Sequence, residues 1–397
     1  MNTESSGIRS FLFFCDCQRS TLVYLCAPKI LSMGLQCGIV GLPNVGKSTL
    51  FNALSNAKAQ AANFPFCTIE PNVGVITVPD DRLNQLAKLV NPKKVTPATV
   101  EIVDIAGLVK GASKGEGLGN QFLGNIRNVD AIIHVIRCFD DDNVIHVDGS
   151  VNPVRDKEII DAELQLKDLE SIEKKIARIE RAAKSGDKEL KRALEVTEIY
   201  KQHLMSGKSA RSAPVSKEDR QYVADVFLLT EKPVLYACNV DEQSAVTGNK
   251  YVEQLRESVK DENAEVLIIS AAIEAEIAQL DSYEDRLSFL KDMGLDEPGV
   301  NKLIHASYHL LNLITYFTAG EQEVRAWTIH RGMLAPQAAG VIHSDFEKGF
   351  IRAEVIAYDD YVQYQSEAAC RSAGKLRLEG KEYEVKDGDV MHFLFNV

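Results

Sequence analysis

The feature that most constrains this chain is an eight-residue loop, Gly41 to Ser48, that reads Gly-Leu-Pro-Asn-Val-Gly-Lys-Ser. The loop matches the pattern G-x-x-x-x-G-K-[ST] and stands between an apolar run at 37–40 and helical spacing at 49–57. Glycines let backbone N–H groups close around phosphates, and the N-terminus of the following helix favours anions. The sequence therefore predicts a strand, a phosphate-binding loop and a helix of an α/β nucleotide-binding fold.

The positions of this loop have distinct expected roles. We expect Lys47 to neutralise the β and γ phosphates and the Ser48 hydroxyl to bind Mg²⁺. Thr49 extends the helix start and can contact the α phosphate. The nucleotide-binding residues predicted here are Asn44, Val45, Gly46, Lys47, Ser48 and Thr49.

Further apolar runs predict the rest of a sheet. They cover 99–105, 131–139, 234–240 and 266–270, and polar or glycine-rich residues follow each one. Buried strands that alternate with helical segments are typical of a doubly wound parallel sheet. Because 397 residues exceed one ordinary core, we expect two or three domains.

A second motif follows the strand at 99–105. Residues 104–107 read Asp-Ile-Ala-Gly and match the D-x-x-G of GTPase-class proteins. Asp104 would hold Mg²⁺ through its water, and the Gly107 N–H would sense the γ phosphate. Between the two motifs, Thr68 is the candidate that completes the metal shell, so the predicted metal residues are Ser48, Thr68 and Asp104. Cys67 precedes Thr68, and its oxidation would disturb this switch.

The residue after D-x-x-G is Leu108, where Ras-like proteins carry a glutamine that orients the attacking water. Leucine cannot hydrogen-bond water, so another group or a partner must do so. We consider His134 and His146 as flanking the next strand, and favour His146 because it lies beyond the strand end. The alternative is a histidine without catalytic duty. The predicted catalytic residues are His146, Lys47 and Gly107.

Base selection is predicted from residues 239–242, which read Asn-Val-Asp-Glu. Guanine-specific proteins use N-K-x-D, whose aspartate accepts two hydrogen bonds from guanine. Here Val240 replaces the lysine, and Glu242, one methylene longer, replaces the aspartate. Loss of such a polar pair can change discrimination by on the order of 10⁴. We therefore expect ATP to be preferred over GTP.

The adenine contacts are predicted at two loops. Asn239 and backbone groups near Val240 would hold the base, together with Glu242 at the end of the motif. Ser270 and Ala271 would supply the S-A-x loop that lies against the base.

Long charged helices are predicted between 153 and 230. Leu169, Ile172, Ile176 and Ile179 have the 3, 4, 3 spacing of a coiled-coil seam, and residues 185–187 break it before Leu190, Leu194 and Leu204 continue. This predicts an antiparallel helical hairpin inserted into the sheet domain. Residues 174–211 contain eleven Lys or Arg against five Asp or Glu. That excess is either a solvated helix face or a contact surface for a phosphate backbone.

The two ends of the chain differ from the middle. After about residue 312 the sequence turns β-rich, with strands expected at 324–330, 350–358, 383–385 and 390–395. Residues 1–32 are interpreted as a disordered leader or a start assigned upstream of Met33. No apolar run approaches the roughly 18 residues of a membrane span. Eight scattered cysteines favour a cytoplasmic protein, and with a net charge of −12 any nucleic-acid contact must come from a local patch. We expect no membrane partner and no DNA partner.

Together these motifs resemble the YchF or Obg-like ATPase family, from about Met33 to the C-terminus. The resemblance is carried by the runs GLPNVGKST, NFPFCTIEPN, DIAGLVKGASKGEGLGN and DGDVMHFLFNV, and by the N-x-x-E element. It implies an OBG-type nucleotide domain (33–152 and 231–311), a helical coiled-coil insert (153–230) and a C-terminal TGS domain of β-grasp form (312–395).

The resemblance also carries functional expectations. It implies Mg²⁺-dependent hydrolysis of ATP in preference to GTP, and association with the ribosome or its large subunit. Leu108 then matches a family trait, and His146 resembles the family's catalytic substitute. Asn44 resembles the asparagine of K⁺-dependent relatives, so K⁺ stimulation is a further expectation. The competing interpretations are a GTP-preferring Obg-type ribosome-assembly GTPase, and a binding module with a structural nucleotide.

Overall fold

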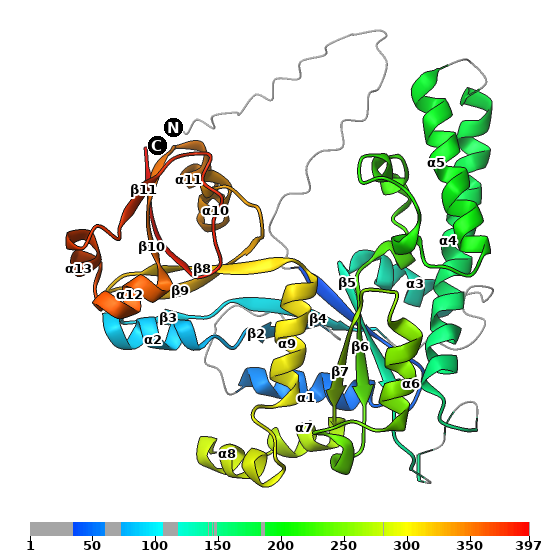
Figure 1. Ribbon diagram of the computed structural model, residues 1–397, viewed down its shortest axis with the longest axis horizontal. Coiled ribbons are helices and arrows are strands. Elements are labelled where there is room, and N and C mark those ends of the chain that lie inside the picture. Colours follow the sequence, from blue (N-terminus) through cyan, green and yellow to red (C-terminus); the bar gives the residue numbers. More distant parts are fainter. Residues whose placement is uncertain are drawn as a thin grey trace, which may run out of the picture. The chain divides into compact units, whose positions relative to one another are not determined.

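The computed structural model describes residues 35–59, 73–105, 118–141, 143–144, 146, 149–183, 187–280 and 282–396. The predicted leader at 1–32 lies outside these residues, as do Cys67, Thr68, Gly107 and Leu108. Figure 1 shows the arrangement of the elements.

A six-stranded sheet forms the core of the nucleotide-binding part, in the order β2-β4-β1-β5-β6-β7. Its strands are β1 (Gln36–Val40), β2 (Val73–Thr77), β4 (Thr99–Asp104), β5 (Ala131–Arg137), β6 (Val234–Asn239) and β7 (Glu265–Ile269). All neighbours are parallel except β2, which pairs antiparallel with β4. The predicted α/β fold with a P-loop and parallel sheet is confirmed.

Burial along the strands explains their places. Every residue of β5 and β6 is buried, as expected for central strands covered on both faces. Strand β2 alternates half-buried and buried residues, which fits an edge position. We did not predict β2, because its five residues carry no long apolar run.

Helices cover both faces of this sheet. They are α1 (Lys47–Ala59), α3 (Leu118–Asn128), α6 (Lys250–Val259) and α9 (Gly299–Leu310), whereas α7 (Ala271–Ile277) packs on α1 and α8 (Tyr283–Asp292) packs with α7. Figure 1 shows α9 on one side of the sheet and α6 on the other. The carboxyl ends of the parallel strands therefore share one edge, and the loops that follow β1, β4, β5, β6 and β7 meet there.

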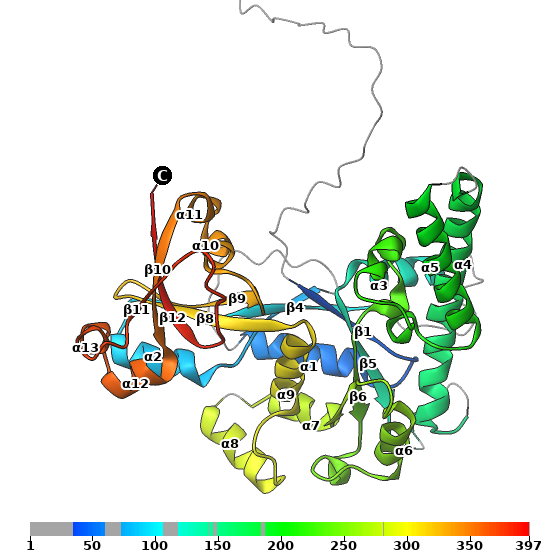
Figure 2. The ribbon, with the colours of Figure 1, turned by 45° about the horizontal axis from the view of Figure 1, so that its top comes forward.

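Two long helices follow the loop after β5. Helix α4 (Pro153–Ala183) and helix α5 (Lys188–Met205) lie side by side (Figures 1 and 2). Their shared core includes Ile172 but differs from the predicted seam on α5, where Leu190 and Leu194 are only half-buried. The buried positions of α5 are Ala193, Val196, Thr197, Tyr200 and Leu204.

The residues after α5 correct the expected extent of the helices. Three short 3₁₀ turns, at Ala210–Ser212, Asp219–Val226 and Leu229–Glu231, replace helix in this stretch. The buried carboxylate of Asp168 accepts N–H bonds from Leu229 and Thr230 at 2.7 and 2.8 Å. This carboxylate fixes the returning chain against α4.

The C-terminal part has a second six-stranded sheet, in the order β11-β10-β12-β8-β9-β3. Its strands are β3 (Val95–Thr96), β8 (Leu313–Ala319), β9 (Val324–His330), β10 (Phe350–Ala357), β11 (Arg377–Glu379) and β12 (Asp389–Phe395). Strands β12 and β8 pair in parallel, whereas β8 with β9 and β10 with β12 are antiparallel. Strand β3 comes from the nucleotide-binding part and pairs in parallel with β9.

Three predicted strands of this part match β9, β10 and β12, but the strand expected at 383–385 is wrong. Those residues make only an isolated bridge between Glu384 and Leu334. Four short helices also interrupt the strands, so the part is less purely β than expected. They are α10 (Ala335–Ile342), α11 (Ser344–Lys348), α12 (Tyr358–Tyr364) and α13 (Glu367–Ser372).

Candidate phosphate-binding site

The loop of residues 41–46 connects β1 to α1 as predicted, and two glycines make its path possible. Gly46 has φ of 96°, and a Cβ there would lie 2.3 Å from the Nδ2 atom of Asn239. Gly41 has φ of 156°, and its Cβ would lie 2.4 Å from the Val135 carbonyl oxygen. Helix α1 begins at Lys47, so its N-terminal N–H groups face the loop. The backbone therefore forms the expected cradle.

The Lys47 side chain folds over this cradle. Its Nζ donates to the Leu42 carbonyl oxygen at 2.8 Å, and the residue is buried. Burial lowers the pKa of the ammonium group, while the nearby Asp104 carboxylate acts in the opposite direction. Ser48 and Thr49 are exposed at the start of α1, and Asn44 is exposed with φ of 61°.

Two polar atoms at this edge of the sheet are buried without a hydrogen-bond partner. In the part of the chain that the structure describes, three such side-chain atoms occur, and Asp104 Oδ1 and Ser270 Oγ are two of them. Burial raises the pKa of Asp104, and Lys47 opposes that shift. Buried polar atoms normally make hydrogen bonds. Two buried oxygens without partners beside a phosphate loop therefore indicate a place for a ligand or a metal-bound water.

Asn239 connects three loops at the carboxyl edge. Its Nδ2 donates to the Val45 carbonyl oxygen, and its Oδ1 accepts from the Ala271 N–H, both at 2.9 Å. The side chain is buried between the phosphate loop and the start of α7. Asn239 thus uses one donor and one acceptor within the protein and sets the distance between Val45 and Ala271.

The other residues of the base motif differ in burial and in hydrogen-bond partners. Val240 is buried in the main core, and its N–H donates to the Ile269 carbonyl oxygen at 2.9 Å. Asp241 accepts from the Ser244 N–H at 2.9 Å and caps a short 3₁₀ turn. Glu242 is exposed at the first position of that turn. Neither carboxylate side chain is buried, so this loop lacks an enclosed carboxylate.

The two candidate histidines have different surroundings. His134 lies in the middle of β5 rather than at its flank, and burial lowers its pKa to about 3. It is therefore a neutral core residue. His146 lies beyond the end of β5, and its Nε2 is 2.8 Å from Asp156 Oδ2 in the first turn of α4. Of the two, only His146 belongs to a loop at the carboxyl edge.

Sequence reasoning missed two residues that hold the His146 loop, Arg137 and Asp156. Both are charged and almost fully buried, with exposed fractions of 1 % and 2 %. A useful signal was present, since Arg137 ends a strand whose other residues are uncharged. Buried charges are rare unless they are paired, so such an arginine requires several acceptors nearby.

The predicted basic surface of residues 174–211 is largely compensated. Its cations pair with acidic residues that mostly fall outside the counted window: Lys174 with Glu170, Lys175 with Asp225, Arg178 with Asp225 at 2.7 Å, Arg192 with Asp219 at 2.6 Å, and Lys201 with Glu173 at 3.5 Å. These pairs favour a solvated helix face over a strongly cationic surface.

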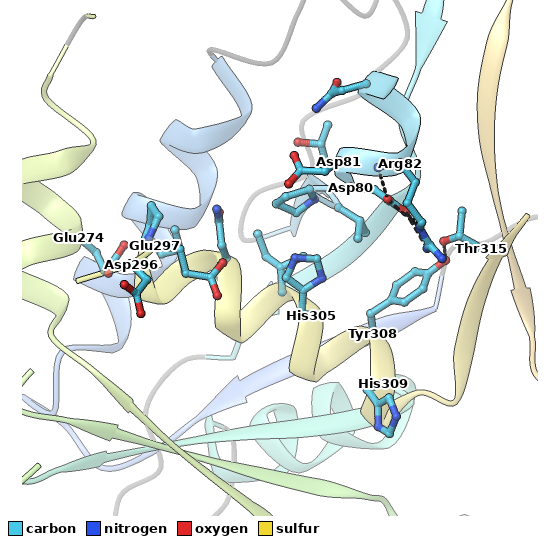
Figure 3. Close-up of a pocket in the computed structure, with 18 of the residues that line it drawn as sticks. Asp80, Asp81, Arg82, Glu274, Asp296, Glu297, His305, Tyr308, His309 and Thr315 are labelled. Carbon is cyan, nitrogen blue, oxygen red and sulfur yellow. Dashed lines mark hydrogen bonds and ion pairs between the residues drawn. The ribbon is translucent and has the colours of Figure 1, made fainter. Parts of the chain in front are cut away.

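A large cavity of about 1190 Å³ lies elsewhere, between α2 (Asp81–Val90), helices α7 to α9 and β8 (Figure 3). Its charged walls are used to join elements. Arg82 donates to Asp80 and to Asp387, each at 2.8 Å, and the Glu274 Oε1 accepts from the Gly299 N–H at 2.7 Å. Because the lining residues do not include the phosphate loop, we place the candidate site at the loop and not in this cavity.

The described residues contain neither a self-sufficient metal cluster nor a membrane-spanning helix. No group of three or more His, Cys, Asp or Glu side chains there could hold a metal ion by itself. Within the same residues, no helix is long and apolar enough to span a bilayer.

Comparison with known proteins identifies the family. A model described as a 50S ribosome-binding GTPase matches residues 36–183, and the YchF-GTPase C-terminal model, described as a protein of unknown function, matches residues 313–396. The protein named Ribosome-binding ATPase YchF from Pasteurella multocida is 56% identical over 365 residues, which cover 92% of this chain and 100% of that protein. The chain belongs to the YchF family.

Further similar proteins support this assignment or share the fold. The Bacillus subtilis protein of the same name is 56% identical over 367 residues, with 92% of this chain and 100% of that protein covered. The solved structure of the Schizosaccharomyces pombe YchF GTPase has a TM-score of 0.83 at 40% identity, covering 91% of this chain and 98% of that one. A GTP-binding protein from Pyrococcus horikoshii, with a TM-score of 0.56 at 21% identity over 91% of this chain and 100% of that one, shares the fold.

Proposed function

We propose that this chain is a Mg²⁺-dependent ATPase that prefers ATP to GTP and binds the ribosome or its large subunit as a regulatory switch. The observation that carries the nucleotide preference is the geometry of the base motif. Val240 is buried in the core and Glu242 is exposed on a turn, so neither reproduces the lysine and aspartate that select guanine. The names of the bacterial relatives, Ribosome-binding ATPase YchF, support the activity and the partner.

Mg²⁺ fits the residues at the phosphate loop. The unpartnered Asp104 Oδ1 and the exposed Ser48 hydroxyl are hard oxygen donors of the kind that Mg²⁺ prefers. We propose that Ser48, Thr68 and Asp104 hold the ion, which when bound neutralises charge on the β and γ phosphates. We further propose that Asn44 contributes to a K⁺ site, and that Gly107 contacts the γ phosphate.

The remaining site residues have proposed roles that follow from their places. Val45, Gly46, Lys47 and Thr49 would bind phosphates through the loop and the start of α1. Asn239, Val240, Glu242, Ser270 and Ala271 would frame the base, with Asn239 acting mainly by fixing the loops. Lys47 would stabilise the charge on the transferred phosphoryl group, and His146 would orient the attacking water in place of the missing glutamine.

The finer domain assignment is also a proposal. We infer an OBG-type nucleotide domain at 33–152 and 231–311, a coiled-coil hairpin insert at 153–230 and a TGS domain at 312–395. Support comes from the side-by-side helices α4 and α5 and from the parallel pairing of β12 with β8 in a sheet that is otherwise largely antiparallel. A ribosomal partner would place the protein in the cytoplasm.

The nucleotide preference is tested by competition. ATP and GTP would each displace a fluorescent nucleotide from the full chain in Mg²⁺ buffer. We expect ATP to bind at least about tenfold more tightly, because guanine finds no enclosed carboxylate here. The variant Glu242→Asp should raise GTP affinity relative to ATP. Tighter binding of GTP by the unaltered chain would overturn the proposal.

One observation favours the second candidate, a GTP-preferring ribosome-assembly GTPase: the family model that matches residues 36–183 is described as a 50S ribosome-binding GTPase. The competition experiment separates these candidates. Co-sedimentation with ribosomes over a range of salt concentrations tests the partner that both share, and the salt slope reports the number of phosphate contacts. If the protein co-sediments with ribosomes at low salt in neither the triphosphate nor the diphosphate state, ribosome binding is excluded.

A further inference from the structure

The loop that carries His146 is tied to the end of β5 by one arginine. Arg137, the last residue of β5, donates Nε to the Phe139 carbonyl oxygen at 3.0 Å and Nη1 to the Val144 carbonyl oxygen at 2.8 Å. Its Nη2 donates to the Asp141 carbonyl oxygen at 3.2 Å. Since this guanidinium is almost fully buried and donates to three carbonyls of the loop, it holds Phe139, Asp141 and Val144 close to the end of β5.

A carboxylate fixes the imidazole itself. Asp156 Oδ2 lies 2.8 Å from His146 Nε2, and the two side chains are only 3% and 7% exposed. The other oxygen of Asp156 accepts from Arg155 at 3.3 and 3.1 Å. Asp156 belongs to the first turn of α4, so the insert helix holds the ring from outside the loop.

This contact decides which nitrogen of the ring carries the proton. A carboxylate only accepts, so the His146 Nε2 must donate to it, and in the neutral ring the lone pair then lies on Nδ1. A histidine that orients water must keep its ring in a fixed plane, and the buried carboxylate on Nε2 holds that plane.

We propose that Asp156 is a positioning residue for His146, which fixes its tautomer and links the first turn of the insert helix to ATP hydrolysis. The proposal rests on the proposed role of His146 in hydrolysis. Displacement of α4 at its base would move Asp156, and the imidazole would lose its orientation. The distal end of α4 and the start of α5 would thereby influence hydrolysis through α4 without contact to the nucleotide.

The test is a double-mutant cycle in the full chain, with kcat for ATP hydrolysis and the Kd for ATP measured separately. Asp156→Asn keeps the shape but cannot hold the imidazole with a carboxylate. We expect kcat to fall at least about tenfold while Kd changes less than twofold. Asp156→Glu should restore part of kcat. In the His146→Ala background, Asp156→Asn should have less than a twofold effect, because its target is gone.

The outcomes distinguish a failure of the positioning role of Asp156 from a failure of the proposed role of His146. A fall in kcat that persists in the His146→Ala background would show that Asp156 has only a structural role, and an unaltered kcat would equally overturn the proposal. If His146→Ala itself hydrolyses ATP normally, the proposed role of His146 fails first. The matched control is Asp161→Asn on the same helix, which breaks the 2.6 Å pair with Lys157 but leaves the loop alone, and kcat should stay within about twofold.

A measurement on the unaltered chain keeps the proposal testable if a variant does not fold. Histidine ¹⁵N labelling and NMR report the tautomer of each ring, and comparison with His146→Ala assigns the signal among eight histidines. We expect His146 to carry its proton on Nε2. A ring protonated on Nδ1 with Nε2 bare would overturn the proposal.

Discussion

Replacement of Asn239 by aspartate tests whether this side chain fixes the site. Aspartate has the same shape and still accepts from the Ala271 N–H, but an ionised carboxylate cannot donate to the Val45 carbonyl oxygen 2.9 Å away. The buried carbonyl then loses its partner, which costs about 1–3 kcal/mol. The two oxygens also repel, and the charge is buried in a residue that is 4% exposed. We expect a loss of unfolding free energy of at least about 3 kcal/mol at pH 8.

The pH dependence sharpens this prediction. Burial raises the pKa of the new carboxyl in the folded state, so its protonated form contributes stability at low pH that is lost as pH rises through that pKa. A protonated carboxyl can again donate to Val45, and the deficit should shrink toward about 1 kcal/mol at pH 5. ATP affinity should fall in parallel at pH 8, because the phosphate loop and the base loop separate.

The assay is urea unfolding of both chains at pH 5 and pH 8, followed by far-ultraviolet circular dichroism. The single tryptophan, Trp327, lies in β9 of the C-terminal part and would report the wrong sheet. Asp241→Asn is the matched control, since it alters the next carboxylate of the motif at an exposed cap and should cost at most about 1 kcal/mol. A stability of Asn239→Asp within about 0.5 kcal/mol of the unaltered chain at pH 8 would refute the reasoning.

Three further predictions concern the same region. Gly46→Ala should reduce ATP affinity at least about tenfold in the displacement assay, because its φ of 96° and the 2.3 Å approach to Asn239 exclude a Cβ; retained affinity would contradict the tight loop. Burial raises the pKa of Glu274 from 4.5 to about 7, so the protonated carboxyl contributes stability that is fully present below pH 4.5 and is lost as the pH rises through 7. In urea unfolding, the unfolding free energy of Glu274→Gln should therefore rise by about 3 kcal/mol relative to that of the unaltered chain between pH 4.5 and 8. A difference that does not change with pH would show that the backbone N–H bonds to the carboxylate cancel the effect of burial. Removal of Mg²⁺ by EDTA should abolish phosphate release and Mg²⁺ should restore it, whereas Asp104→Asn should remain slow at saturating Mg²⁺.

The sequence predicted the parts of this molecule that are local and missed those that depend on distant residues. The phosphate loop could be predicted because its conformation is encoded in eight consecutive residues. Asn239 was assigned to the base, but its bonds reach residues 194 and 32 positions away, which no spacing reveals. His134 was placed at a strand flank although β5 buries it, because an apolar run does not show where its polar member faces. The seam on α5 shifted for a similar reason, since the 3₁₀ turns also cover that helix.

The short strand β3 has a consequence for how the protein can be divided. Val95 and Thr96 pair with Val324 and Arg325, so the chain that follows α2 supplies the outermost strand of the C-terminal sheet. A C-terminal fragment that begins at residue 313 would lack β3, so the N–H and C=O groups on the outer edge of β9 would be unpaired. An exposed edge of this kind promotes pairing with other chains. Rotation of the C-terminal sheet away from the nucleotide sheet would also require residues 91–99 to move or the hydrogen bonds between β3 and β9 to break. Backbone hydrogen bonds thus join the two parts of the molecule. A displacement of the C-terminal sheet would be transmitted through β3 to β4, the strand that ends at Asp104.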